Sequence, residues 1–285
     1  MSDNPFPPQR QQYPGSSGAM EPEPEDEMRD YEGRGLLTGR RALVTGGDSG
    51  IGRAVAVAFA KEGADVAIAY LSEDDDARHT AKLVEEAGRR ALLLPGDLAE
   101  EAHCEEVVTR TVAELGGLEI VVNNVAFQNP VESLTELTTA QWERTFRTNV
   151  YSYFWVTRAA LPHLPDRIGT IINTASVNGL RGNKSLIDYA ATKGAVLAFT
   201  YSMAQSLQER EIRVNCVAPG PVWTPLIPAT MGEEKTASFG RQAPMGRAAQ
   251  PDEIAPSYVF FASERLSSYY NGEVLAPVGG ETMPG

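Results

Sequence analysis

Residues 42–62 of the 285-residue chain read ALVTGGDSGIGRAVAVAFAKE, and this stretch decides the fold. An apolar run, Ala42–Thr45, is typical of a buried strand, and a helical pattern, Ile51–Glu62, follows it almost at once. The turn between them carries the pattern Gly-x-x-x-Gly-x-Gly at Gly46, Gly50 and Gly52. Such a turn lets an anion approach the free amides at a helix amino end, so a phosphate-bearing ligand is expected here. The spacing differs from the commoner Gly-x-Gly-x-x-Gly of dinucleotide sites.

The same alternation of strand and helix continues along the chain. Apolar strand patterns lie at Ala42–Thr45, Asp65–Ala69, Ala91–Leu94, Leu118–Val122, Thr170–Asn173, Arg213–Val217 and Val274–Ala276. Amphipathic helical patterns lie at Ile51–Glu62, Asp74–Ala87, Glu101–Leu115, Gln141–Leu164, Asp188–Glu209 and Asp252–Ser263. Unbroken apolar strands between helices predict an α/β fold, a doubly wound seven-stranded parallel sheet with helices on both faces, in a single domain.

Two segments depart from this rhythm. Residues 1–37 are rich in proline and acidic residues and show no helical or strand period, so they form either a disordered tail or an arm that lies on the body or on a neighbouring subunit. The domain proper is expected at 38–285. Within it, about 221–249 looks loop-like, and an insertion beyond a strand's carboxyl end predicts a lid over a site.

Composition limits the partners. The formal net charge of −13 opposes binding to nucleic acid or to an anionic membrane surface, because phosphate backbones need a basic footprint. Cys104 and Cys216 are expected as buried, reduced thiols, and the scattered histidines predict no metal site. No run approaches the length of a membrane span, and a cytoplasmic location is expected.

The carboxyl ends of the second to fourth strands should line the ligand crevice. The second strand ends near Tyr70 without an acidic residue in place to accept the ribose 2′-hydroxyl of NAD, and Arg53 is a candidate partner for a 2′-phosphate. This leaves NAD and NADP both open, with a slight lean to NADP. Asp97, in Asp97-Leu98, could accept from an adenine amino group, and Asn124 could contact a ribose or tie strands together.

Residues 169–193, GTIINTASVNGLRGNKSLIDYAATK, carry the chemistry. Ser176 follows a strand pattern, and Tyr189 and Lys193 lie four residues apart, on one face of the next helix. A hydroxyl, a phenol and an ammonium group that converge can move a proton to or from a substrate oxygen. A free phenol has a pKa of about 10, and a cation four residues away, together with the positive nicotinamide ring of an oxidised cofactor, is expected to lower it.

Together these motifs resemble the short-chain dehydrogenase/reductase family. The matching pieces occur in family order across about residues 38–281: Thr45-Gly46-x-x-x-Gly50-x-Gly52, Asp97-Leu98, Asn123-Asn124, Asn149, Ser176, Tyr189-x-x-x-Lys193 and Pro219-Gly220. The glycine turn and the long acidic tail resemble a bacterial subgroup described as aldehyde or carbonyl reductases and as relatives of glucose dehydrogenases. One departure is Ala126, which stands where the family usually has glycine.

The resemblance implies a Rossmann-like fold, a homotetramer, and hydride transfer between a nicotinamide and an alcohol or carbonyl. It implies that Tyr189 is the general acid or base, that Ser176 binds the substrate oxygen, that Lys193 holds the nicotinamide ribose and that Asn149 holds a water for proton supply. It also implies a set of cofactor-binding residues: Gly46, Asp48, Ser49, Gly50, Ile51, Gly52, Tyr70, Asp97, Leu98, Asn124, Val125, Tyr189, Lys193, Pro219, Gly220, Val222 and Thr224.

Two other functions compete with this one. A catalytically silent NAD(P)-binding regulatory protein would usually lack the tyrosine or the lysine, and both are present. An epimerase or dehydratase would usually carry a larger carboxyl-terminal substrate domain. The lid contains Met231, Phe239, Pro244 and Met245, which favour a small aldehyde or ketone over a highly charged substrate.

Overall fold

The computed structural model describes residues 6–282. Seven strands form one parallel sheet in the order β3-β2-β1-β4-β5-β6-β7, which confirms the predicted fold class. The strands are β1 (Arg41–Thr45), β2 (Asp65–Tyr70), β3 (Ala91–Pro95), β4 (Ile120–Asn123), β5 (Thr170–Thr174), β6 (Arg213–Val217) and β7 (Val274–Leu275). The order reverses between β1 and β4, and an open α/β sheet binds its ligand at such a switch point.

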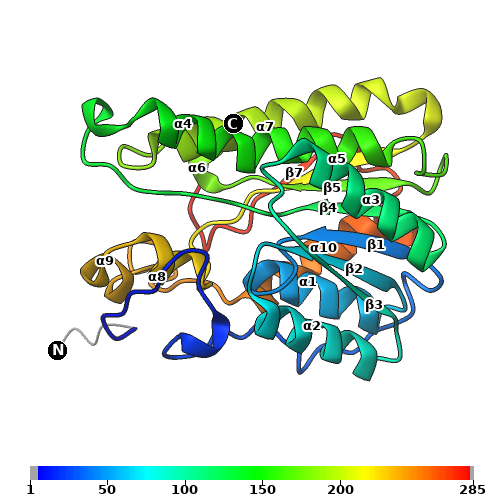
Figure 1. Cartoon of the computed structure of the whole chain (residues 1–285), viewed down its shortest axis with the longest axis horizontal. Coiled ribbons are helices and arrows are strands. Elements are labelled where there is room, and N and C mark those ends of the chain that lie inside the picture. Colours follow the sequence, from blue (N-terminus) through cyan, green and yellow to red (C-terminus); the bar gives the residue numbers. More distant parts are fainter. Residues whose placement is uncertain (1–5, 283–285) are drawn as a thin grey trace.

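Helices cover both faces of this sheet (Figure 1). They are α1 (Gly50–Lys61), α2 (Asp74–Glu86), α3 (Glu101–Leu115), α4 (Thr139–Phe146), α5 (Ser152–Ala160), α6 (Val177–Arg181), α7 (Ile187–Ser206), α8 (Leu226–Thr230), α9 (Glu233–Ala237), α10 (Pro251–Ala262) and α11 (Glu264–Ser267). Helices α1, α2 and α10 pack on one face of the sheet, and α3, α5 and α7 pack on the other.

The sheet register explains why both faces are apolar. Successive residues of a strand point to opposite faces, and paired neighbours share a face. Val44 pairs with Ile68 and Val122, and all three pack with α1 and α10. Leu43 pairs with Ala67, and both pack with α3 and α5 on the other face. A fully apolar strand therefore requires two layers of helix, as the sequence predicts.

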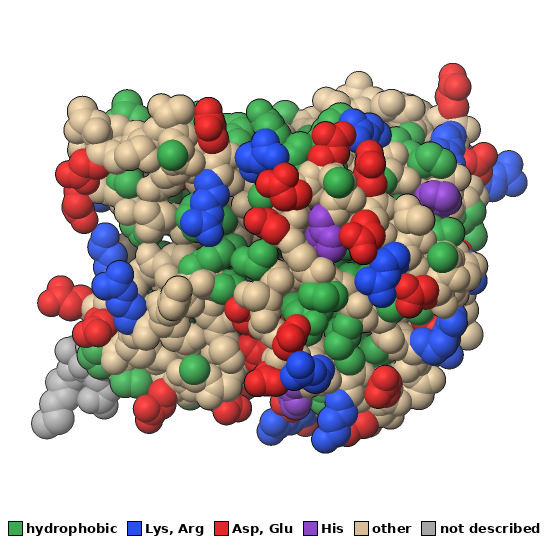
Figure 2. Space-filling view, viewed as in Figure 1, with side chains coloured by type: hydrophobic (Ala, Val, Ile, Leu, Met, Phe, Trp, Pro, Cys, Tyr) green, Lys and Arg blue, Asp and Glu red, His purple; other side chains and the backbone are tan. Residues whose placement is uncertain are grey.

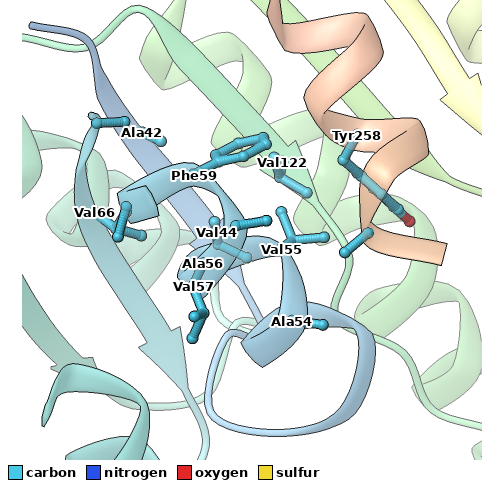
Figure 3. Close-up of a cluster of buried hydrophobic side chains, with 14 of the residues drawn as sticks. Ala42, Val44, Ala54, Val55, Ala56, Val57, Phe59, Val66, Val122 and Tyr258 are labelled. Carbon is cyan, nitrogen blue, oxygen red and sulfur yellow. The ribbon is translucent and has the colours of Figure 1, made fainter. Parts of the chain in front are cut away.

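Helix α1 packs closely on the sheet because its residues are small (Figure 3). Its interior alternates alanine with valine and one phenylalanine, and every residue from Ala54 to Ala60 is buried. Phe59 lies between β1 and α10, and full burial of such a ring stabilises the fold by roughly 1.5–3 kcal/mol. This packing fixes the amino end of α1 at the carboxyl end of β1.

Two predicted elements are wrong in detail. The single helix expected over 141–164 is interrupted by a π-helical turn at Arg147–Tyr151, which separates α4 from α5. The segment 221–249 is not purely loop, since it contains the short helices α8 and α9. Sequence periodicity could not place either feature, because a π-turn and a one-turn helix use the same residue types as their surroundings.

The described part of the amino-terminal segment lies on the body of its own chain. Asp26 accepts a hydrogen bond from the Gly50 N–H (2.9 Å), at the first residue of α1. It also pairs with Arg53 (3.1 Å), whose guanidinium pairs with Asp76 of α2 (2.9 Å). All three of these side chains are buried, so each charge depends on the others for compensation.

The surface carries charges of both signs. Figure 2 shows acidic and basic side chains interspersed over one face, without a continuous basic patch. Within residues 6–282, no helix is both long enough and apolar enough to cross a membrane.

We predict that Arg53→Met lowers the free energy of unfolding by about 3–5 kcal/mol, because it leaves Asp26 and Asp76 buried without their cation. Chemical denaturation followed by circular dichroism measures the change. The matched control is Arg78→Met, whose side chain is 61% exposed and pairs with Asp74 and Asp75, and it should cost no more than about 1 kcal/mol. Equal stability of the two variants would contradict the proposed role of the buried network.

Candidate active site

A cleft of about 700 Å³ lies at the carboxyl ends of the strands. Its lining includes nearly all the residues that the sequence predicted: Gly46, Asp48, Ser49, Gly50, Ile51, Tyr70, Asp97, Leu98, Asn124, Val125, Ser176, Tyr189, Lys193, Pro219, Gly220, Val222 and Thr224. Gly52 and Asn149 lie outside the lining. The volume suits a dinucleotide together with a small substrate.

The glycine turn fits the phosphate role. Gly46 and Gly50 have φ values of +63° and +52°, which side-chain-bearing residues rarely adopt. A Cβ on Gly50 would lie 2.9 Å from the Thr224 side chain, so the start of the lid rests on this turn. Gly52 acts differently, because a Cβ there would lie 1.8 Å from the Gly46 carbonyl oxygen. Its role is to let α1 approach the turn, whose backbone then faces the cleft.

Asn124 holds the turn from the other side. Its side-chain amide donates to the carbonyls of Thr45 (3.2 Å) and Gly46 (3.1 Å), and its backbone N–H donates to the Thr45 hydroxyl (2.8 Å). The sequence left two roles open for Asn124, contact with a ribose and a tie between strands. The structure shows the tie, which joins the end of β4 to the end of β1. Asp97 accepts from the Ala99 N–H (2.8 Å) and still lines the cleft.

Ser176, Tyr189 and Lys193 share one wall of the cleft. Ser176 caps α6, where its hydroxyl oxygen accepts from the Asn178 N–H (3.2 Å). Tyr189 lies in the first turn of α7, next to the buried Asp188. Asp188 in turn accepts from Thr145 (2.7 Å), which fixes the amino end of α7 against α4. A hydroxyl, a phenol and an amine are thus held on rigid elements and directed into one space.

Lys193 is almost completely buried, with 1% of its surface exposed. Its ammonium donates to the Thr174 carbonyl (2.7 Å) at the end of β5, and it lies 3.4 Å from the Tyr153 hydroxyl oxygen. Tyr153 also donates to the Thr174 carbonyl (3.2 Å). No local pattern in the sequence indicates these contacts, because they join residues 19 to 40 positions apart.

Burial shifts the pKa values of Tyr189 and Lys193 in opposite directions. Burial raises the pKa of Tyr189 to about 12, and a hydrogen bond from Ser176 offsets this in part. Burial also lowers the pKa of Lys193 to about 7. The lowering expected from Lys193 and an oxidised nicotinamide together concerns the coenzyme-bound protein, whereas in the chain alone loss of hydration dominates the pKa of Tyr189. A phenol with a raised pKa stays protonated at neutral pH and can act as an acid.

Asn149 lies within the π-helical turn and is fully buried. Its side chain donates to the Phe127 carbonyl (2.8 Å) and to Thr192 (3.1 Å), and it accepts from the Phe127 N–H (2.7 Å). These bonds use both side-chain donors. Asn149 thus ties the segment after β4 to α7, beside Lys193.

Arg53 is unavailable to a 2′-phosphate. Its guanidinium is 3% exposed and contacts Asp26, Asp76, Thr80 and the Asp48 carbonyl. The corner of the cleft at the end of β2 is instead lined by Asp48, Tyr70 and Glu73. Burial raises the pKa of Asp48 to about 6, so the carboxyl group changes from neutral to negatively charged as the pH rises through that value.

The lid supplies a mixed lining. Met231, Phe239 and Pro244 line the cleft as expected, whereas Met245 is outside the lining and 65% exposed. Lys235 also lines the cleft, so the pocket combines apolar side chains with a cation.

Comparisons with known proteins agree with this geometry. A family model described as enoyl-(acyl carrier protein) reductase matches residues 46–282. General stress protein 39 of Bacillus subtilis (strain 168) is 54% identical over 267 residues, which cover 94% of this chain and 93% of that protein. NADPH-dependent aldehyde reductase 1, chloroplastic, of Arabidopsis thaliana is 48% identical over 276 residues, covering 95% and 96% of the two chains. A crystal structure of a short chain dehydrogenase from Burkholderia cenocepacia J2315 in complex with NADP is 34% identical, with a TM-score of 0.80, and covers 86% of this chain and 98% of that chain.

We predict that Gly52→Ala weakens the binding of NADPH or NADH by about tenfold or more, because the added methyl group must displace the turn from α1. Fluorescence titration of the reduced coenzyme measures the effect. Gly194→Ala is the matched control, since its methyl group would lie 3.7 Å from the nearest atom, the Gly179 carbonyl oxygen. Unchanged affinity in the Gly52 variant would show that the turn does not hold the coenzyme.

Proposed function

Because the chain belongs to the short-chain dehydrogenase/reductase family and is an NAD(P)-dependent oxidoreductase, we propose that it reduces small aldehydes and ketones to alcohols. The observation that carries this proposal is the shared wall of Ser176, Tyr189 and Lys193 in the cleft. The name of the Arabidopsis relative, an aldehyde reductase, and the apolar side chains of the lid both support it.

The bound nicotinamide supplies the hydride, and the chain supplies the proton. Tyr189 donates its phenolic proton to the carbonyl oxygen, and its raised pKa keeps that proton in place at neutral pH. The Ser176 hydroxyl donates a hydrogen bond to the same oxygen as negative charge develops there. Lys193 stabilises the phenolate that remains. Asn149 holds α7 in place through Thr192 while Tyr189 takes up a new proton.

In the reverse direction the same residues oxidise an alcohol. Tyr189 must then lose its proton, and burial opposes this in the chain alone. A positive charge on the oxidised coenzyme would lower the phenol's pKa. We therefore propose that the rate of alcohol oxidation rises with pH, as Tyr189 loses its proton, whereas carbonyl reduction proceeds with Tyr189 protonated at neutral pH.

Coenzyme choice depends on the corner lined by Asp48 and Glu73. A carboxylate there accepts from a ribose 2′-hydroxyl and repels a 2′-phosphate. Solved relatives include an NADP complex, and we propose that this chain accepts both coenzymes, with the charge of Asp48 setting their ratio. Asp48 is neutral below its pKa of about 6 and charged above it, so NADPH is favoured as the pH falls.

We also propose a homotetramer in the cytoplasm. Tyr151, Phe154 and Tyr201 are each 44–45% exposed on or beside α5 and α7, where they are suited to contact a second subunit. Cys104 and Cys216 lie buried as free thiols, as suits a reducing compartment. Sedimentation velocity would measure the number of subunits.

The catalytic assignment predicts that Tyr189→Phe lowers kcat for aldehyde reduction by about 10²–10⁴-fold, since it removes only the proton donor. Coenzyme affinity should stay within about twofold, because the ring remains. Tyr269→Phe, whose side chain is 98% exposed, is the matched control and should keep full activity. A Tyr189 variant that turned over at the wild-type rate would refute the assignment.

The coenzyme assignment predicts that Asp48→Asn raises the ratio of kcat/KM for NADPH to that for NADH by about tenfold at pH 7.5. In the wild type this ratio should rise as the pH falls from 8 to 5.5, and the variant should show a flatter profile. Asp75→Asn, whose side chain is fully exposed, controls for a general change of surface charge. If Asp48→Asn left this ratio of kcat/KM values unchanged, the ribose that carries the 2′-phosphate in NADPH would have to bind elsewhere.

A further inference from the structure

The amino-terminal segment reaches the cleft itself. Tyr13 and Pro14 form part of the lining, among residues that follow β1, β3 and β4. The Tyr13 hydroxyl donates to the Ala126 carbonyl (3.3 Å), and its ring meets Phe127 edge-on at 5.1 Å. The Arg144 guanidinium lies 5.3 Å from the centre of the same ring. One side of Tyr13 is therefore fixed on the segment after β4.

The residues on either side of Tyr13 are fixed on the lid. The Gln11 N–H donates to the Pro228 carbonyl of α8 (2.9 Å). A Cβ on Gly15 would lie 2.7 Å from the Pro225 carbonyl oxygen, so the backbone passes directly against the start of α8. Figure 1 shows this dark blue segment beside α8. Residues 11–15 thus extend from the lid to the loop after β4, and we call them the strap.

The strap crosses the crevice above the glycine turn. Thr224, just before α8, contacts Gly50, and Val125, just before Ala126, lies 3.2 Å from the Cβ position of Gly46. Both ends of the strap therefore rest on the walls that border the turn. A dinucleotide whose pyrophosphate lies at the amino end of α1 would pass beneath Tyr13.

Tyr13 forms a wall and does not fill the site. The cleft retains about 700 Å³ with Tyr13 and Pro14 in place, which is in the range of small-molecule and cofactor sites. Burial raises the pKa of Tyr13 to about 12, so the phenol stays protonated and keeps its bond to Ala126. These features suit a cover over a ligand better than a plug.

The charges of the segment are arranged to suit an anionic ligand. Residues 9–16, QRQQYPGS, carry one arginine and no carboxylate. Most of the segment's acidic residues come later, between residues 21 and 32, where Asp26 pairs with Arg53 and Glu27 contacts His79. The part of the segment that crosses the cleft is thus the part without negative charge.

We propose that Tyr13 is a cofactor-contacting residue and that the strap closes over the coenzyme's pyrophosphate, so that the coenzyme leaves only when the strap lifts. This proposal rests on the dinucleotide site assigned above. The strap's own anchors support it, because Phe6 stacks on Trp223 at 3.6 Å and the Trp223 indole donates to the Pro22 carbonyl (2.9 Å). Both contacts hold the segment to the lid on either side of Tyr13.

The test uses the full chain with Tyr13→Ala, Tyr13→Phe and, as matched control, Tyr269→Ala, whose side chain is 98% exposed. Stopped-flow displacement of bound NADPH and NADH gives the dissociation rates. We expect Tyr13→Ala to speed dissociation about tenfold and Tyr13→Phe by a smaller factor, because phenylalanine keeps the ring and loses the bond to Ala126. Tyr269→Ala should match the wild type.

A second readout reports the strap directly. Trypsin cleavage after Arg10, which is exposed, should slow when NADPH is added to the wild type and should not slow in Tyr13→Ala. Dissociation rates within twofold of the wild type in both Tyr13 variants would overturn the proposal. Slower dissociation in Tyr13→Ala would also overturn it, since Tyr13 would then compete with the coenzyme. A wild-type chain that bound neither coenzyme would overturn the proposed function as well.

Discussion

The free N–H groups at the amino end of α1 are the constraint on which the rest of the structure depends. A helix leaves its first N–H groups without partners inside the helix, and here it starts directly beneath the carboxyl end of β1. Asp26 satisfies the Gly50 N–H from outside the cleft and brings the amino-terminal segment with it. The cleft side of the turn stays open to an anionic ligand. One helix end thus anchors the amino-terminal segment and borders the proposed coenzyme site.

The sequence was most informative where structure is local. Arg213–Val217 and Glu101–Leu115 match their predicted bounds because an apolar run or a 3.6-residue period is contained within each segment. Gly46 and Gly50 could be singled out because only a special backbone calls for glycine there. The members of the site could be identified from spacing, since Tyr189 and Lys193 share a helix face whatever surrounds them.

The sequence was least informative where partners are distant. Arg53 looked like a candidate for a phosphate because it follows the last glycine, and its actual partners, Asp26 and Asp76, lie 27 and 23 residues away. The raised pKa of Tyr189 also depends on residues that are distant in the sequence. Charge spacing along α7 suggests that Lys193 lowers it, whereas the burial that raises it comes from the surrounding fold. Desolvation depends on every neighbour, and so it cannot be read from two positions on one helix.

A chain of net charge −13 must still attract a coenzyme that carries several negative charges. Long-range attraction is unavailable, and affinity has to come from short-range contacts that are shielded from water. In the proposed coenzyme site, backbone amides at the end of α1 and the buried Lys193 would supply such contacts, which act more strongly where the local dielectric is low. A strap that excludes water over the pyrophosphate would strengthen each of them. An acidic enzyme therefore gains more from covering its coenzyme than a basic one, which could hold it by surface charge alone.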